Sequence, residues 1–506
     1  MHLYLQGNDY HFELENISRL FLPLEKIVTH HEERFPAVGD GLMAECSQAD
    51  TAAGAALSCR VRLEGFDRTL TATEPAGEEI RDRCELTLCT LLYRLLSELL
   101  DCSQTWGLVT GVRPVKLLRR LVREMGREPA LTYYREKLLV SEEKLSLCCR
   151  TLEIENEILS LSRPDSFSLY VSIPFCPTRC DYCSFVSQTV ERAKKLIPAY
   201  VEQLCRELRY TGALVKGMGL HLETVYFGGG TPTTLSAEQL TAVLRTVEES
   251  FDLSHLREYT VEAGRPDTVT AEKLAVLRAA GVGRVSINPQ TLQQSVLDGI
   301  GRRHTVEQFY EAFALASKAG FDNINTDLIA GLPGDTYGGF TDTLEKILAL
   351  NPESVTVHTL SMKRASNLML QHRADYRTES ETVQMVGHSA ASLPRAGYRP
   401  YYLYRQSRTV GNQENVGWAK PGSEGLYNVY IMDETHTILG CGAGAVSKLK
   451  QPGTDYLERI FNYKFPYEYN TGLEEMLARK QAIPAFYEKY CSAAGLQRKP
   501  DGCIME

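Results

Sequence analysis

The stretch SIPFCPTRCDYCSF, residues 172–185, places three cysteines within eight positions. Cys176, Cys180 and Cys183 have the spacing C-x3-C-x2-C. Zinc usually takes four ligands from two knuckles far apart in sequence, and the chain has no second C-x2-C or H-x3-H pair. Three thiolates instead fit a [4Fe–4S] cluster that leaves one iron open to a small molecule. The spacing therefore favours an iron–sulfur cluster over zinc.

Short β-rich runs and helical segments alternate from this stretch onward. Alternation of this kind predicts a parallel sheet built from right-handed crossovers. Six such units predict an α/β barrel or partial barrel rather than an open doubly wound sheet. The predicted strands are 169–175, 223–227, 258–263, 284–288, 323–329 and 354–360.

The carboxyl ends of these predicted strands carry polar or glycine-rich groups. The first strand ends in the cysteine loop, and the second ends in GGGTPT, residues 228–233. Glu262 ends the third strand, Asn288 and Gln290 follow the fourth, and Asp327 lies in the fifth. Active sites of parallel barrels form from the loops at this end of the strands. We therefore expect these groups to converge in one site.

Composition restricts the class of protein. The chain has 506 residues, of which 43% are hydrophobic and 24% charged, the balance of a soluble globular protein. Its net charge of −9 argues against nucleic acid as the main partner. The polar N-terminus does not resemble a signal peptide, and no apolar run approaches the roughly 18 residues of a membrane span. We expect a cytoplasmic protein without a membrane span.

Three domains are predicted from the distribution of these patterns. Residues 1–165 combine strand-like pieces with an apolar-striped helix over 84–100, which predicts an α+β domain. Residues 166–365 form the predicted barrel, and residues 366–506 form a third domain on the substrate side. Cysteines outside the 176–183 group, such as Cys84 and Cys89, are interpreted as small buried hydrophobic residues.

The motifs in combination resemble a known family. The cysteine motif with Tyr182 before its last cysteine is similar to that of the radical S-adenosylmethionine (SAM) superfamily. GGGTP at 228–232 is similar to the loop that meets the amino group of SAM in that superfamily. The chain further resembles the oxygen-independent coproporphyrinogen III oxidases (coproporphyrinogen dehydrogenases), HemZ-type branch. The motifs that carry this resemblance are LYVSIPFC, YFGGGTPT, SINPQTL, IGRRH, NTDLIAGLPG, GNQENVGWAKPG, LGCGAGAVS and TGVRP.

This resemblance implies a fold and a set of cofactors. The fold is a partial (β/α)6 barrel, similar to a TIM barrel, with an additional N-terminal α+β domain and a mostly helical C-terminal extension. The cofactors are a [4Fe–4S] cluster held by Cys176, Cys180 and Cys183, and SAM on the open iron. The residues that align with SAM contacts are Tyr170, Tyr182, Gly229, Gly230, Thr231, Glu262, Gln290, Arg302 and Asp327.

The resemblance also implies a tetrapyrrole substrate. In the family reaction, two propionates of coproporphyrinogen III lose CO2 and become vinyl groups, which gives protoporphyrinogen IX. The reaction requires an electron donor and an electron acceptor. A pocket for a tetra-acid with apolar pyrroles should combine aromatic faces with cations. The residues that fit this description are Tyr401, Tyr402, Tyr404, Arg405 and Arg408.

Two positions depart from the family pattern. Phe185 occupies the place of a fourth cysteine, and Ser172 that of a common histidine. Because the fourth cysteine lies outside the cluster motif, cluster binding is expected to survive, while decarboxylase activity is put in question. The alternatives are a haem-binding chaperone, which shares the C-x-F ending, a haem-modifying radical SAM methyltransferase, and a zinc-stabilised barrel of another function.

Overall fold

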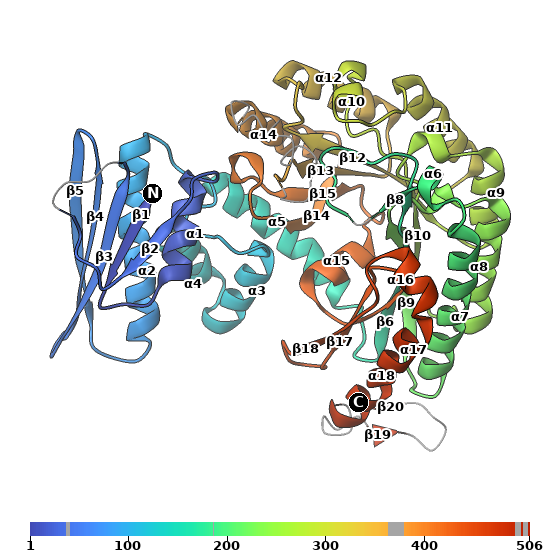
Figure 1. Ribbon diagram of the computed structural model, residues 1–506, viewed down its shortest axis with the longest axis horizontal. Helices are drawn as coiled ribbons and strands as arrows, with labels where there is room; N and C mark the ends of the chain where they lie inside the picture. Colours follow the sequence, from blue (N-terminus) through green and yellow to red (C-terminus); the bar gives the residue numbers. More distant parts are fainter. Residues whose placement is uncertain (37–40, 186, 363–378, 491–496, 499–503, 506) are drawn as a thin grey trace. The chain divides into compact units, whose positions relative to one another are not determined.

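The computed structural model divides the chain into two compact units, Met1–Cys149 and Arg150–Glu506, with the boundary inside helix α5 (Glu142–Leu159). The predicted boundary between residues 365 and 366 lies outside the described residues, so the three-domain division remains a prediction. The structure describes residues 1–506 except 37–40, 186, 363–378, 491–496, 499–503 and 506 (Figure 1).

The first unit contains a five-stranded sheet in the order β2-β1-β3-β4-β5. Strand β1 pairs in parallel with β2 and β3, and the β3–β4 and β4–β5 pairs are antiparallel. The strands are β1 (His2–Gln6), β2 (Val28–His31), β3 (Met43–Thr51), β4 (Gly54–Leu63) and β5 (Phe66–Pro75). The helices are α1 (His11–Phe21), α2 (Ile80–Leu100), α3 (Pro114–Met125), α4 (Arg127–Thr132), the π-helical turn η1 (Tyr133–Lys137) and α5.

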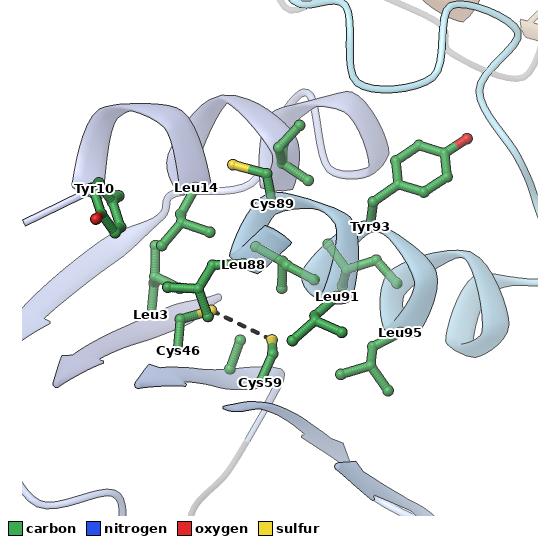
Figure 2. Close-up of a cluster of buried hydrophobic side chains, with 14 of the residues drawn as sticks. Leu3, Tyr10, Leu14, Cys46, Cys59, Leu88, Cys89, Leu91, Tyr93 and Leu95 are labelled. Carbon is green, nitrogen blue, oxygen red and sulfur yellow. Dashed lines mark hydrogen bonds between the residues drawn. The ribbon is translucent and has the colours of Figure 1, made fainter. Parts of the chain in front are cut away.

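The core of this unit lies between the sheet and helices α1 and α2 (Figure 2). Leu88 on α2 and Leu3 on β1 are fully buried there. Cys46 and Cys59 face each other across the β3–β4 pair, with their Sγ atoms 3.3 Å apart. Cys89 is also buried, so these cysteines pack as small hydrophobic side chains, as predicted for Cys89.

The second unit is built on an eleven-stranded sheet. Its central six strands are parallel neighbours in chain order, which confirms the six predicted strands and the parallel sheet. They are β6 (Ser166–Ile173), β9 (His221–Gly229), β10 (Glu258–Glu262), β11 (Arg284–Ser286), β12 (Asn323–Ala330) and β13 (Ser354–Thr359). Figure 1 shows helices of this half along the outer side of the sheet. They are α7 (Ile197–Lys216), α8 (Ala237–Ser250), α9 (Ala271–Ala279) and α11 (Val306–Ala319), followed by α12 (Tyr337–Leu350).

Local sequence sets where these helices begin. Ser236 and Gln239 form a capping box at the start of α8, and Thr305 with Gln308 forms another at α11. The connecting elements lie mostly at the carboxyl ends of the strands. They are β7 (Phe175–Cys176), β8 (Gln188–Thr189), α6 (Val190–Ala193), η2 (Pro232–Thr234), η3 (Pro266–Thr268) and α10 (Gln294–Gly299).

The C-terminal part of the chain extends this sheet on both sides. Strand β16 pairs in parallel with β6 and leads to β17 and β18, while β15 pairs antiparallel with β13 and leads to β14. These strands are β14 (Arg399–Tyr404), β15 (Asn415–Ala419), β16 (Thr437–Cys441), β17 (Val446–Lys450) and β18 (Leu457–Phe461).

Helices make up much of the remaining C-terminal chain, as predicted. Within the described part of the chain, no helix combines the length and the apolar character that crossing a membrane requires. The remaining elements are α14 (Glu379–Arg395), η5 (Val410–Asn412), α15 (Leu426–Asp433), α16 (Pro466–Thr471), α17 (Leu473–Lys480), α18 (Ala482–Tyr490), β19 (Gln497–Arg498) and β20 (Ile504–Met505).

Candidate functional site

The cysteine loop follows β6 and lines a cavity at the carboxyl ends of the parallel strands. Cys176, Cys180 and Cys183 all contribute to the cavity wall. The amide of Cys183 donates to the carbonyl of Cys180 across 3.1 Å, which closes a tight turn between these two residues. Burial raises the pKa of the Cys176 thiol and raises that of Cys183 to about 11. Thiolates at these positions therefore need a bound metal centre to stabilise them.

The glycine loop after β9 lies directly against the cysteine loop. The amide of Gly230 donates to the carbonyl of Ile173 (2.8 Å), and the amide of Thr231 donates to that of Phe175 (2.7 Å). Gly229 has a left-handed φ of 104°. A Cβ atom on Gly230 would lie 2.5 Å from the Phe175 carbonyl oxygen, so only glycine permits this approach.

Two carboxylates face the same cavity, Glu262 at the end of β10 and Asp327 within β12, and their pKa values are shifted in opposite directions. Burial raises the pKa of Glu262 to about 7, even though the Tyr226 hydroxyl donates to it across 2.6 Å. Burial also acts to raise the pKa of Asp327, but hydrogen bonding and charge interaction with His358 outweigh it and lower that pKa. Asn288 further donates to Asp327 across 2.7 Å. The cavity therefore pairs one readily protonated acid with one held as a carboxylate.

Two buried polar atoms in the cavity wall have no hydrogen-bond partner among the described residues. They are Oε1 of Gln290 and Nε of Arg302. The rest of the Arg302 guanidinium is held in place, since Nη2 donates to the carbonyls of Gly264 (2.6 Å) and Asn288 (2.5 Å). Buried polar groups normally find partners, so these atoms fit a polar ligand such as SAM.

The cavity has a volume of about 360 Å³, within the roughly 300–1,000 Å³ of small-molecule pockets. It brings together most of the residues predicted as ligand contacts. Those that line it are Cys176, Cys180, Tyr182, Cys183, Gly229, Gly230, Thr231, Glu262, Gln290, Arg302, Asp327, Tyr402 and Tyr404.

Four predicted residues are absent from this wall. The ring of Tyr170 is stacked on those of Tyr226 and Tyr427 at centroid distances of 6.3 and 6.1 Å. Tyr401 is fully buried, and Arg405 is buried with its Nη2 donating to the carbonyl of Asn412 (3.1 Å). Arg408 lies in the loop after β14 with a left-handed φ of 62°. The cation expected beside the tyrosines is therefore not supplied by either arginine at this cavity.

Several residues that line the cavity were not predicted from the sequence. Strand β11 and the segment after it present alternate residues to the cavity, Arg284, Ser286, Asn288 and Gln290, and this period of two was the signal for the inward face. The missed residues include Tyr226, Arg265, Arg284, Asn325 and His358, whereas Asn288 was expected in the site from its place after a strand.

The donor set fits an iron–sulfur cluster better than a single metal ion. Across the described residues, no group of three or more His, Cys, Asp or Glu side chains is placed to hold one ion. A [4Fe–4S] cluster instead takes one thiolate on each of several irons, so its ligands stand further apart. The three cysteines in one wall, with the glycine loop beside them, fit that arrangement.

Comparisons with known proteins show the family to which the chain is related. Residues 170–347 match the radical SAM superfamily. The oxygen-independent coproporphyrinogen-III oxidase-like protein HemZ of Bacillus subtilis (strain 168) is 36% identical over 488 residues, which are 95% of this chain and 96% of that protein. The heme chaperone HemW of Lactococcus lactis subsp. lactis (strain IL1403) is 33% identical over 328 residues, 64% of this chain and 80% of that protein.

One solved structure supports the fold. Coproporphyrinogen III oxidase (HemN) of Escherichia coli, described as a radical SAM enzyme, aligns with a TM-score of 0.51 and 23% sequence identity. The alignment covers 64% of this chain and 73% of that one. The predicted barrel fold is confirmed by this likeness together with the order of the six parallel strands.

Proposed function

Because the chain belongs to the radical SAM superfamily, in its family of HemZ-type oxygen-independent coproporphyrinogen III oxidase-like proteins, we propose that it oxidatively decarboxylates coproporphyrinogen III. Each of two propionates would lose a hydrogen atom, CO2 and one further electron, and would become a vinyl group. The product is protoporphyrinogen IX. The reaction requires an electron donor and an acceptor, both unidentified.

The cofactors of this family are a [4Fe–4S] cluster and SAM, which together supply the radical chemistry that removes hydrogen from an unactivated C–H bond. In this proposal Cys176, Cys180 and Cys183 hold the cluster. Backbone groups of the glycine loop approach SAM closely because no Cβ intervenes. Glu262 and Asp327 accept hydrogen bonds from its ammonium and ribose hydroxyl groups, and Arg302 donates to its carboxylate.

The tetrapyrrole assignment rests on one observation, the buried cation Arg284 in the cavity wall. Its side chain is 4% exposed and lines the cavity from β11. The acceptors of its guanidinium are neutral, the Tyr401 hydroxyl (3.2 Å) and the Ser423 carbonyl (3.1 Å). The acid acting on it, Glu258, uses its oxygens to accept from the amides at the start of α15. The Arg284 guanidinium is positively charged, and we expect it to bind a substrate carboxylate.

Aromatic side chains accompany this cation in the same cavity. Tyr226, Tyr402 and Tyr404 line the wall, and the last two rings stack at a centroid distance of 6.2 Å. Flat apolar faces beside a buried guanidinium match a pyrrole that carries a propionate. This combination replaces the cations predicted at Arg405 and Arg408.

An anaerobic product assay tests the proposal. The purified holoprotein is incubated with coproporphyrinogen III, SAM and a low-potential reductant, and the porphyrinogens are separated after oxidation. We expect the mono-decarboxylated intermediate harderoporphyrinogen, followed by protoporphyrinogen IX. SAM cleavage without loss of CO2 from the porphyrinogen would overturn the decarboxylase assignment.

A haem chaperone is the second candidate, and one observation favours it. Phe185, at the position of the fourth cysteine of the oxidases, lines the cavity and is 67% exposed. An exposed aromatic ring at the cavity mouth offers an apolar surface for haem. Stable stoichiometric binding of haem by the holoprotein, together with an inactive decarboxylation assay, would select this candidate.

A further inference from the structure

Two buried guanidinium groups converge on the sulfur of Cys180. Nη1 of Arg265 lies 3.9 Å from this Sγ atom, and Nη1 of Arg302 lies 3.8 Å from it. Arg265 and Arg302 are 3% and 4% exposed. Arg265 comes from the loop after β10 and Arg302 from the loop after α10, so two separate segments place positive charge at one cluster ligand.

Arg265 is fixed between an acid and the cysteine loop. Its Nε and Nη2 donate to the two carboxylate oxygens of Asp267, at 3.0 and 2.9 Å. Its Nη1 donates to the side chain of Thr178 at 3.0 Å and to the carbonyl of Thr178 at 3.4 Å. Thr178 lies between Cys176 and Cys180, so Arg265 restrains the cysteine loop as well as approaching its sulfur.

The hydrogen-bond pattern separates the roles of the two arginines. Arg302 has a buried Nε without a described partner, which suits it to a ligand. In Arg265 each guanidinium nitrogen donates to Asp267, Thr178 or Cys180, so groups of the protein itself hold the side chain in place. Arg265 is therefore a positioning residue that acts through the loop and the cluster.

Two guanidinium groups lie near Cys180, and Asp267 offsets part of their charge because it pairs with Arg265. His304 is fully buried near both arginines, and burial together with the charges of Arg302 and Arg265 lowers its pKa to about 2. A cation close to a thiolate in a medium of low dielectric constant favours additional negative charge there. One-electron reduction adds such charge to an iron–sulfur cluster, and hydrogen bonds to its sulfurs help to set its potential.

We propose that Arg265 raises the reduction potential of the [4Fe–4S] cluster by placing a fixed cation at Cys180, and that it holds the cysteine loop through Thr178. The proposal concerns the cluster alone. Its success or failure is therefore independent of which tetrapyrrole the protein acts on.

The test compares three variants of the reconstituted full chain. Arg265→Gln removes the charge, and Arg265→Lys keeps a charge but cannot form the fork to Asp267. Arg278→Gln is the matched control, since Arg278 pairs with Asp322 and does not line the cavity. Midpoint potentials are measured by dithionite titration monitored by electron paramagnetic resonance, with iron content measured in parallel.

We expect a more negative midpoint potential in Arg265→Gln, a smaller shift in Arg265→Lys, and no shift in Arg278→Gln. SAM is left out of the titration, so loss of a SAM contact cannot produce the shift. A potential in Arg265→Gln equal to that of the unmodified protein overturns the proposal. If Arg265→Gln takes up no cluster, the uncharged Arg265→Met is titrated in its place, and an unshifted potential in that variant overturns the proposal.

Discussion

The hydroxyl of Thr231 lies 3.6 Å from the sulfur of Cys176, which joins the glycine loop to the cysteine loop. Strands β6 and β9 are parallel neighbours, and Ile173 pairs with Gly229 at their carboxyl ends. The backbone of the glycine loop therefore lies next to the cysteines that would hold a cluster. This contact links the cysteine loop and the glycine loop into one structural unit.

Replacement of Cys180 by alanine should remove the cluster and leave the barrel folded. Cys180 lines the cavity, so its main contribution is ligation rather than core packing. We expect iron content to fall well below half of the normal value, with an unchanged circular dichroism spectrum. Cys205→Ala is the control, because Cys205 is buried on α7 away from the cavity wall. Normal iron content in Cys180→Ala would exclude Cys180 as a ligand.

Gly230→Ala should strain the contact between the two loops. Its Cβ would meet the Phe175 carbonyl at 2.5 Å and the Phe175 amide nitrogen at 2.8 Å, and both are backbone atoms of a paired strand. We expect a loss of about 1–3 kcal/mol in the free energy of unfolding of the second unit, together with weaker SAM binding.

Gly217→Ala provides the matched control for this change. Gly217 follows α7 with a φ of −86°, and a Cβ there meets nothing within 4 Å. We expect its stability and SAM affinity to equal those of the unmodified protein. Equal stability of Gly230→Ala and Gly217→Ala would mean that the glycine loop tolerates a side chain.

The sequence predicted the features that depend on local pattern. The six strands, their order and the convergence of Glu262, Gln290 and Asp327 follow from alternation along the chain and from the geometry of parallel strands. The additional sheet strands β14–β18 were not predicted as such. Their pairing with β6 and β13 joins segments far apart in sequence, and no local pattern specifies such partners.

The positively charged residues of the cavity were predicted less well than its carboxylates. Arg405 was chosen because it follows a tyrosine-rich run, but adjacent residues of a strand point to opposite faces. Tyr402 and Tyr404 line the cavity, whereas Arg405 and Tyr401 do not. Arg265 and Arg284 were missed because their importance comes from contacts with Cys180 and with Tyr401, more than 80 residues away along the chain.

Glu262→Gln should change the dependence of stability on pH in the cluster-free protein. The pKa of Glu262 is about 7 in the folded chain and near 4.5 when unfolded, so the folded state binds the proton more tightly. Its contribution to stability is complete below pH 4.5 and is lost as pH rises towards 7. Relative to Glu262→Gln, the unmodified protein should lose about 1–3 kcal/mol between pH 4.5 and 7.5.

The measurement is chemical denaturation of both proteins across this pH range, followed through the transition of the second unit. Iron uptake by Glu262→Gln serves as the control, and we expect it to be normal because Glu262 is not a thiolate ligand. A constant difference in the free energy of unfolding between the two proteins at all pH values would show that Glu262 titrates normally.

Arg284→Gln should weaken the binding of a carboxylated tetrapyrrole. The guanidinium is buried beside the tyrosines of the cavity, and loss of a charge-assisted hydrogen bond of this kind costs about 1.5–3 kcal/mol. That corresponds to a roughly 10- to 150-fold larger dissociation constant for coproporphyrin III, measured by fluorescence titration. The tetramethyl ester of coproporphyrin III carries no carboxylates, so its affinity should be equal in both proteins. If the variant weakens acid and ester equally, Arg284 supports the cavity structurally and does not bind a propionate. If the unmodified protein binds neither compound, the tetrapyrrole assignment itself fails.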